Sequence, residues 1–421
     1  MVLNKTTLAN GIRILTQTLP HYRSVSMGVW VNVGARDETA DESGLSHFIE
    51  HMIFKGTRRR TAFQIAKEFD AIGGYTNAYT TPETTCYHAK VMDAHIETMV
   101  DILSDIFLNS VFDDDEMERE RLVIAQEIGM IEDSPEEYVH VLSETAFWGD
   151  HPLGRPISGS RENVLRIDAD ALKRFFLRLY QPERIVVSAA GSVDHDRLVA
   201  ILEPKFGAVE KGNGFPERQT TRGRSGLFVH PRDLGQLHIC LGTGGLSITD
   251  PRRYAASLLS TVLGGNMSSR LFQKIREQRG LAYSVYSFFS SYVDTGMSGI
   301  YLGTDPENGP EAVALIIDEL NAFKETPVDP GELSDAKEYT RSNLIMATES
   351  VDNQMVRIAQ NEIHFGEDLP LPEIISHVDK VTCEDIMTLS REIFRPDPLA
   401  LTLLGPVPDQ TPYENLAGVT A

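Results

Sequence analysis

Residues 176–193 read FLRLYQPERIVVSAAGSV and decide the fold, because a second version of this stretch comes near the end of the chain. Residues 390–407 read SREIFRPDPLALTLLGPV, with the same order of helix end, proline turn, apolar strand and glycine. Near the start of each half, residues 31–34 (VNVG) similarly match residues 241–244 (LGTG). Self-similarity at a long spacing indicates a duplicated structural unit.

Each unit is expected to combine strands with amphipathic helices. In the first unit, the apolar pattern predicts strands at 12–17, 25–33, 75–80, 84–91 and 185–190. Helical periodicity predicts helices at 62–72, 94–108, 116–131, 136–147 and 168–179. We therefore predict an α+β fold of two homologous α/β-roll repeats, each a mostly antiparallel sheet covered by helices.

The glycines and charges of residues 207–226 indicate a connection between the repeats. We predict an N-terminal domain at 1–210, a linker at 211–221 and a C-terminal domain at 222–421. The 421 residues, 41% of them hydrophobic, give both domains enough apolar side chains for a core.

The composition favours a soluble protein without nucleic-acid or membrane partners. No run of about 18 apolar residues occurs, and residues 1–10 lack the apolar stretch of a signal peptide. A cytoplasmic location in a bacterium is expected, with the mitochondrial matrix as the alternative. The formal net charge of −22 repels nucleic acid and favours basic peptides as partners, although acidic surfaces also serve solubility alone. Core packing is expected for the three widely spaced cysteines, Cys86, Cys240 and Cys383.

Residues 44–57, GLSHFIEHMIFKGT, hold the motif that carries chemistry. On a helix, His47 and His51 emerge from one face one turn apart and form a metal-chelating pair. Glu50 lies beside them and can take a proton from water without being a ligand. Asp41 or Ser43 is expected to cap this helix. Histidines at this spacing also occur as plain polar patches, so other features must decide.

A catalytic zinc ion needs a third protein ligand and an open fourth position. Glu120 and Glu127 lie two turns apart on the predicted helix 116–131, project from one face and can supply that ligand. Glutamates at this spacing are also common on solvated helix surfaces. The second repeat lacks the metal-binding groups, because its equivalent positions carry Ser257, Ser260, Thr261 and Arg341. A site confined to one repeat favours catalysis over a structural role.

Together, the HxxEH motif, the distant glutamate and the two-repeat layout resemble the inverted zinc peptidases of the pitrilysin and insulysin family. The resemblance covers essentially the whole chain and is closest to the mitochondrial processing peptidase subgroup, in its bacterial single-subunit type. It implies that His47, His51 and Glu127 bind one Zn²⁺ per chain. It also implies that Glu50 is the general base and that Glu120 orients a ligand or tunes the site.

The same resemblance implies residues that bind substrate. Residues 74–80 are similar to the family strand whose exposed edge pairs with an extended peptide, at the positions of Asn77 and Ala78. Glu83 matches the family without a role that we can derive. Arg276 and Tyr283 correspond to residues that hold the substrate and stabilise the oxyanion of the scissile carbonyl. Without the family, this pair would be an exposed helix end and a packed tyrosine.

The resemblance also implies an assembly. Long family members carry four such units that close as a clamshell around a chamber, and this chain carries two. A homodimer with a composite active site is expected, in which Arg276 and Tyr283 complete the partner's zinc site, although some relatives divide these features between two different subunits. The expected activity is that of a zinc metalloendopeptidase acting on unfolded or presequence-like peptides. The alternative is a non-catalytic core or scaffold subunit derived from a processing peptidase.

Overall fold

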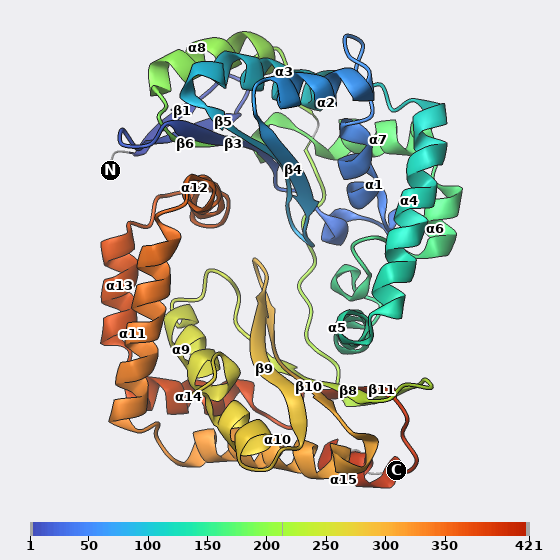
Figure 1. The fold of residues 1–421 in the computed structure, drawn as a ribbon, viewed down its shortest axis with the longest axis vertical. Coiled ribbons are helices and arrows are strands. Elements are labelled where there is room, and N and C mark those ends of the chain that lie inside the picture. The colour runs from blue at the N-terminus through green and yellow to red at the C-terminus, as the bar shows by residue number, and fades with distance from the viewer. Residues whose placement is uncertain (1–2, 213, 418–421) are drawn as a thin grey trace. The chain divides into compact units, whose positions relative to one another are not determined.

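Two β-sheets organise the computed structural model, which describes residues 3–212 and 214–417 (Figure 1). The first sheet has six strands in the order β1-β2-β6-β3-β5-β4. Only β2 and β6 run parallel, and every other neighbouring pair is antiparallel. The strands are β1 (Leu3–Thr7), β2 (Arg13–Thr18), β3 (Ser24–Val31), β4 (Tyr75–Thr80), β5 (Thr85–Met92) and β6 (Ile185–Gly191).

The second sheet repeats this arrangement with one strand fewer. Its order is β7-β11-β8-β10-β9, and its single parallel pair, β7 with β11, is equivalent to β2 with β6. The strands are β7 (Gly226–Pro231), β8 (Leu237–Gly244), β9 (Ala282–Ser291), β10 (Gly296–Thr304) and β11 (Leu399–Gly405). The matching strand orders confirm the predicted α+β fold of two homologous repeats.

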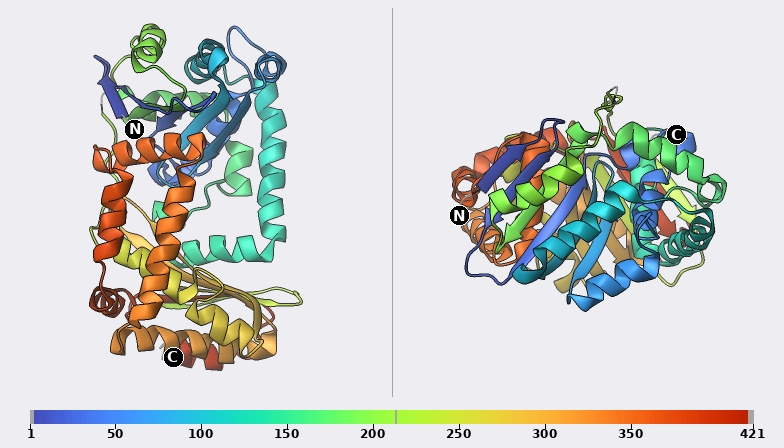
Figure 2. Two further views of the ribbon diagram at one scale, coloured as in Figure 1. Left: turned by 60° about the vertical axis from the view of Figure 1, so that its left-hand side comes forward. Right: turned by 90° about the horizontal axis from the view of Figure 1, so that it is seen from above.

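Helices cover both faces of the first sheet, as Figure 1 shows with α3 and α8 over one face and α12 against the other. The right-hand view of Figure 2 looks down onto α8, α3 and α2 above the strands. The helices of this unit are α1 (Leu45–Ile53), α2 (Ala62–Ala71), α3 (Ile96–Asn109), α6 (Arg161–Arg166), α7 (Ala169–Leu179), α8 (His195–Phe206) and α12 (Val351–Phe365), with most of α4 (Asp114–Asp133).

Strand alternation divides the core of this unit into two layers. On β3, Val25, Met27, Val29 and Val31 point into the larger core beneath α1, α3 and α7. Trp30 points the other way and packs against Met355 of α12. Gly28 lies on the same face, where a Cβ atom would come within 2.8 Å of the Met355 sulfur. A larger residue at this position would require the Met355 side chain to shift.

The second unit packs in the same way. Alternate residues of β8 face a core formed with α9 and α14, while Cys240 faces α5. The helices are α5 (Pro135–Trp148), α9 (Arg253–Gly264), α10 (Gly309–Glu325), α11 (Pro330–Ala347), α13 (Leu371–Lys380), α14 (Cys383–Ile393) and α15 (Thr411–Ala417). Cys86 and Cys240 are buried, Cys383 is half-buried, and all three are free thiols. No helix in the described ranges is both long and apolar enough to cross a membrane.

The compact units exchange segments instead of following the order of the repeats. Residues 130–154, which include α5, belong to the second unit, and residues 346–368, which include α12, belong to the first. The domain bounds 1–210 and 222–421 stay a prediction for the repeats along the sequence. In the structure, each of these stretches contributes one helix to the other sheet. Residues 1, 2, 213 and 418–421, at the domain ends and inside the expected linker, lie outside the described residues.

Candidate metal centre

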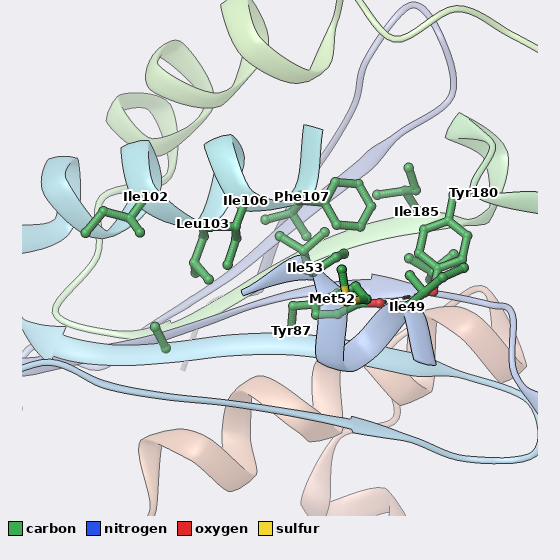
Figure 3. Close-up of a cluster of buried hydrophobic side chains, with 14 of the residues drawn as sticks. Ile49, Met52, Ile53, Tyr87, Ile102, Leu103, Ile106, Phe107, Tyr180 and Ile185 are labelled. Atoms are coloured by element: carbon green, nitrogen blue, oxygen red, sulfur yellow. Dashed lines mark hydrogen bonds between the residues drawn. The ribbon is translucent and has the colours of Figure 1, made fainter. Parts of the chain in front are cut away.

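Helix α1 carries the histidine motif on a buried support. Its five apolar side chains are at most 2% exposed; they are Leu45, Phe48, Ile49, Met52 and Ile53. Figure 3 shows Ile49, Met52 and Ile53 among side chains of α3 and the rings of Tyr87 and Tyr180. Because one face of α1 is fixed in the core, the histidines on its other face have little freedom to move.

The start of α1 is held differently from the expected cap. Gly44 is the N-cap residue, with φ of 98°, and no side-chain cap of its own is present, so the prediction of Asp41 or Ser43 was wrong. A β-carbon at Gly44 would lie 2.9 Å from the Ser158 carbonyl oxygen. The left-handed φ and this close contact both require glycine.

A side-chain carboxyl group from outside the helix takes the place of the missing cap. Glu38 accepts hydrogen bonds from the backbone N–H groups of Gly44 and Ser46, at 2.8 and 2.7 Å. These are donors that the first turn of a helix leaves unpaired. Burial raises the pKa of the Glu38 carboxyl to about 8, against the lowering effect of the two N–H groups. Glu38 thus fixes the beginning of the helix that carries the histidines.

His47, His51 and Glu127 converge on one point. Their ligand atoms all lie within 4.8 Å of one another. The Nε2 atoms of His47 and His51 are 3.7 and 3.3 Å from Oε2 of Glu127. Zinc bonds of roughly 2.0–2.1 Å in tetrahedral geometry place two ligand atoms about 3.4 Å apart, so the three residues fit a zinc ion. Burial and the nearby charge of His51 lower the pKa of His47 to about 4, which keeps this imidazole neutral at pH 7, as a metal ligand must be.

Glu120 contacts one of the candidate ligands. Its Oε2 lies 3.0 Å from Nδ1 of His51, and its Oε1 lies 2.6 Å from Nζ of Lys55. A proton on Nδ1 leaves the lone pair of Nε2 pointing toward Glu127. The solvated-pair alternative does not hold for Glu120, whose side chain is 7% exposed, whereas that of Glu127 is 41% exposed.

Glu50 lies on the same helix and contacts the sheet. The hydroxyl of Thr80, the last residue of β4, donates a 2.6 Å hydrogen bond to Oε2 of Glu50. Burial raises the pKa of the Glu50 carboxyl, and the Thr80 hydrogen bond opposes this shift. A partly desolvated carboxylate beside two metal ligands has the placement of a general base.

Strand β4 is an edge strand of its sheet, paired with β5 alone. Asn77 is exposed, and Ala78 is half-buried against the core. The amide oxygen of Asn77 accepts a 2.9 Å hydrogen bond from the backbone N–H of Ala78. Among the described residues no other strand pairs with this edge, so an added strand can pair with it. That it binds substrate stays a prediction.

Comparisons with known proteins agree with this geometry. Residues 13–161 match the family model "Insulinase (Peptidase family M16)", and residues 166–339 match "Peptidase M16 inactive domain". The zinc protease YmxG of Bacillus subtilis, itself uncharacterized, is 40% identical over 410 residues, which are 96% of this chain and 98% of that protein. The chain belongs to the insulinase family, peptidase family M16.

Solved structures share the fold at low sequence identity. A peptidase M16 inactive domain from Pseudomonas fluorescens superposes with a TM-score of 0.90 at 19% identity, covering 97% of this chain and 99% of its own. A chain of complex III2 from Candida albicans superposes with a TM-score of 0.86 at 18% identity, covering 99% of each chain. At this identity the likeness concerns the fold alone, so the M16 fold does not by itself decide whether a chain is catalytic.

Arg276 and Tyr283, which the family resemblance singles out in the second unit, contact each other. The guanidinium of Arg276 lies 4.8 Å from the ring centroid of Tyr283, at a distance typical of cation–π contacts. Tyr283 is 77% exposed, so it is not the packed tyrosine of the alternative. Both side chains are accessible to a ligand, and their role toward substrate stays a prediction.

The second repeat has no metal ligands at the equivalent place. Helix α9 follows β8 as α1 follows β3, and it carries Ser257, Ser260 and Thr261. The hydroxyl of Ser260 bonds with that of Ser287, 3.0 Å away. Among the described residues, a cluster of three or more metal-ligating groups occurs only in the first repeat of this M16 chain.

The sequence did not indicate three residues that contact α1 or the side chains around its histidines: Glu38, Lys55 and Thr80. Lys55 follows His51 by one helical turn, and that spacing was a usable signal. Thr80 shares its strand face with Ala78, and that alternation was a weaker signal. Glu38 had no signal, because its contact depends on the turn at Gly44.

Proposed function

We propose that the protein is a zinc metalloendopeptidase that hydrolyses peptide bonds in unfolded peptides or presequence-like segments. The convergence of His47, His51 and Glu127, with Glu50 beside them, carries this proposal. Three protein ligands with an open fourth position are typical of catalytic zinc sites. The name of YmxG, a zinc protease, supports the same activity.

In this proposal each residue has a separate task. Zinc, when bound by His47, His51 and Glu127, supplies a Lewis acid that polarises a carbonyl and makes water more acidic. Glu50 takes the proton from the attacking water and delivers it to the leaving amine. The free edge of β4 binds the peptide backbone as an added strand, so that many sequences are accepted.

The alternative is a non-catalytic core or scaffold subunit. The fold permits it, since an M16 inactive domain and a chain of a respiratory complex superpose well. Against it stands the complete set of ligand, base and orienting residues in the first repeat. A scaffold has no need for two histidines, two glutamates and a base in this geometry.

The proposal extends to assembly and location. We infer a homodimer that encloses a chamber, in which Arg276 and Tyr283 of one chain act at the zinc site of its partner. The net charge of −22 favours basic peptides in such a chamber. The bacterial cytoplasm is the proposed compartment.

Cleavage of a quenched basic peptide by the purified protein tests the activity. We expect one zinc per chain, loss of cleavage with a chelator, recovery with added zinc, and no cleavage by Glu50→Gln with its zinc content unchanged. Absence of stoichiometric zinc, or cleavage that survives Glu50→Gln, would contradict the proposal.

Mixed dimers test the composite site. Chains carrying Glu50→Gln and chains carrying Arg276→Ala should each be inactive alone. Together they should recover part of the wild-type rate, because one of the two sites in a mixed dimer then has an intact set. No recovery, despite mixed dimers shown by native mass spectrometry, would count against the composite site.

A further inference from the structure

The proposed base, Glu50, makes one side-chain hydrogen bond within the described residues, and this bond comes from the substrate-binding strand. Thr80 Oγ1 donates to Oε2 of Glu50 at 2.6 Å. The other carboxylate oxygen, Oε1, has no hydrogen-bond donor among the described groups. One oxygen is therefore fixed while the other is left to accept a proton.

A turn directly after Thr80 is internally bonded. The hydroxyl of Thr81 donates to the carbonyl oxygen of Thr84 at 3.0 Å, and it accepts the backbone N–H groups of Glu83 and Thr84 at 3.3 and 2.9 Å. The backbone N–H of Thr81 also donates to the Thr84 carbonyl at 2.8 Å. These bonds close the β4–β5 hairpin and fix the direction in which Thr80 leaves the strand.

The turn is also fastened to the segment that follows β3. The backbone N–H of Arg36 donates to the Pro82 carbonyl at 2.7 Å. The guanidinium of Arg36 contacts Glu83 at 2.7 Å, with both side chains buried. Gly34 lies so close that a Cβ atom would come within 2.7 Å of the Pro82 backbone. Buried ion pairs with additional hydrogen bonds hold one geometry strongly, because loss of either partner leaves a buried charge.

We propose that Thr80 is a positioning residue for the base, and that Glu83 acts through it by holding the turn that aims Thr80 at Glu50. This inference rests on the proposed function, since it concerns the same base. It gives Glu83 a role that the family resemblance does not supply. It also joins the strand that binds substrate to the group that accepts the proton.

Thr80→Val tests the first step, because valine keeps the shape and removes the hydroxyl. We expect kcat for the quenched peptide to fall on the order of tenfold to hundredfold, the loss typical of a slightly misplaced catalytic group. KM, zinc content and the melting temperature should stay close to wild type. Thr80→Ser, which keeps the hydroxyl, should restore most of the lost kcat.

A matched control is Thr6→Val on β1, at the opposite edge of the same sheet. Thr6 Oγ1 also makes a 2.8 Å side-chain hydrogen bond, with His195. Loss of this hydrogen bond in Thr6→Val should leave kcat unchanged. Crystal structures of metal-free wild type and Thr80→Val give a readout independent of activity: Glu50 should have one side-chain conformer in the former and more than one in the latter.

Glu83→Gln tests the second step by a double-mutant cycle. Glu83→Gln should lower kcat, and the double variant with Thr80→Val should be no slower than Thr80→Val alone, because both act through one hydrogen bond. If Glu83→Gln does not fold, Arg36→Lys, which keeps the charge and changes the geometry, takes its place in the cycle. If the fold-losses in kcat of the two single variants multiply in the double variant, the proposed coupling of Glu83 to Thr80 is wrong.

The outcomes separate this inference from the proposed function. A wild-type protein without cleavage overturns the proposed function and this inference with it. A wild-type protein that cleaves, with Thr80→Val at the same kcat, overturns the positioning role alone. A fall in kcat that serine does not restore also contradicts it.

Discussion

The carboxylate of Glu120 lies 3.0 Å from Nδ1 of His51, and the other ring nitrogen, Nε2, faces Glu127. The same carboxylate contacts Nζ of Lys55 at 2.6 Å, so Glu120 interacts with both His51 and the lysine four residues after it. This contact fixes the ring orientation of His51. If His51 is a zinc ligand, removal of the Glu120 carboxylate should weaken zinc binding.

Glu120→Ala is expected to weaken zinc binding about 10- to 100-fold, the usual effect of losing a carboxylate that orients a metal-bound histidine. Competition with a chromophoric chelator at pH 7.5 measures the affinity. Glu116→Gln, one turn earlier on α4, is the control and should bind zinc as wild type does. Equal affinities of Glu120→Ala and wild type would show that His51 is oriented by other contacts.

Glu38→Gln should change how stability depends on pH. The pKa of about 8 in the folded state lies above the ordinary value of 4.5, so between these values the folded state holds a proton that the unfolded state has released. Rising pH therefore favours unfolding of the wild type across this window, by at most about 1.4 kcal/mol per pH unit from this group.

Urea denaturation at pH 5.5 and pH 8 checks this expectation. The free energy of unfolding of wild type, relative to that of Glu38→Gln, should decrease as the pH rises, because glutamine does not titrate. Parallel pH profiles would mean that the Glu38 pKa is close to its ordinary value.

Two glycine substitutions should shift stability in opposite directions. Gly44→Ala places a side chain at φ of 98° and against the Ser158 carbonyl, which should cost about 1–3 kcal/mol. Gly129→Ala lies on α4 with open space around its Cβ position and should stabilise by roughly 0.5–1 kcal/mol. Chemical denaturation measures both, and a neutral Gly44→Ala would contradict the described turn.

Two acidic residues of α12 should differ in how strongly their ion pairs with the first sheet stabilise the protein. Glu362 is 4% exposed and contacts Lys5 and Arg13 at 2.8 and 3.3 Å, whereas Asp352 is 37% exposed and contacts Lys90. Glu362→Ala should destabilise by about 1–3 kcal/mol, since it leaves two cations without their shared partner. Asp352→Ala should stay within about 1 kcal/mol of wild type by urea denaturation. Equal losses would mean that burial does not set the strength of these pairs.

The local elements could be predicted well because their patterns are strong. Strand β4 is found at 75–80 as expected, and the helix expected at 62–72 is found as α2, Ala62–Ala71. Strand β1 was missed because it is a half-exposed edge strand without a clear apolar alternation. Nothing in the local sequence of α5 or α12 says which sheet each helix covers, so the exchange of segments could not be predicted.

The candidate site shows the same division. The spacing of His47 and His51 indicates a chelating pair from the sequence alone, whereas the choice of Glu127 as the third ligand came from the family resemblance. Glu38 and Thr80 reach α1 through contacts that depend on a left-handed glycine and on a hairpin turn. Such contacts are set by three-dimensional structure, which periodicity does not encode.

The exchange of α5 and α12 has a consequence for how the molecule responds to proteolysis. A cut after Gly214 would leave one fragment that still contributes residues 130–154 to the second unit, and another that still contributes residues 346–368 to the first. The nicked chain should run as two bands on a denaturing gel and as a single particle in native chromatography. For the same reason, neither repeat is a module that can be transplanted intact into another protein.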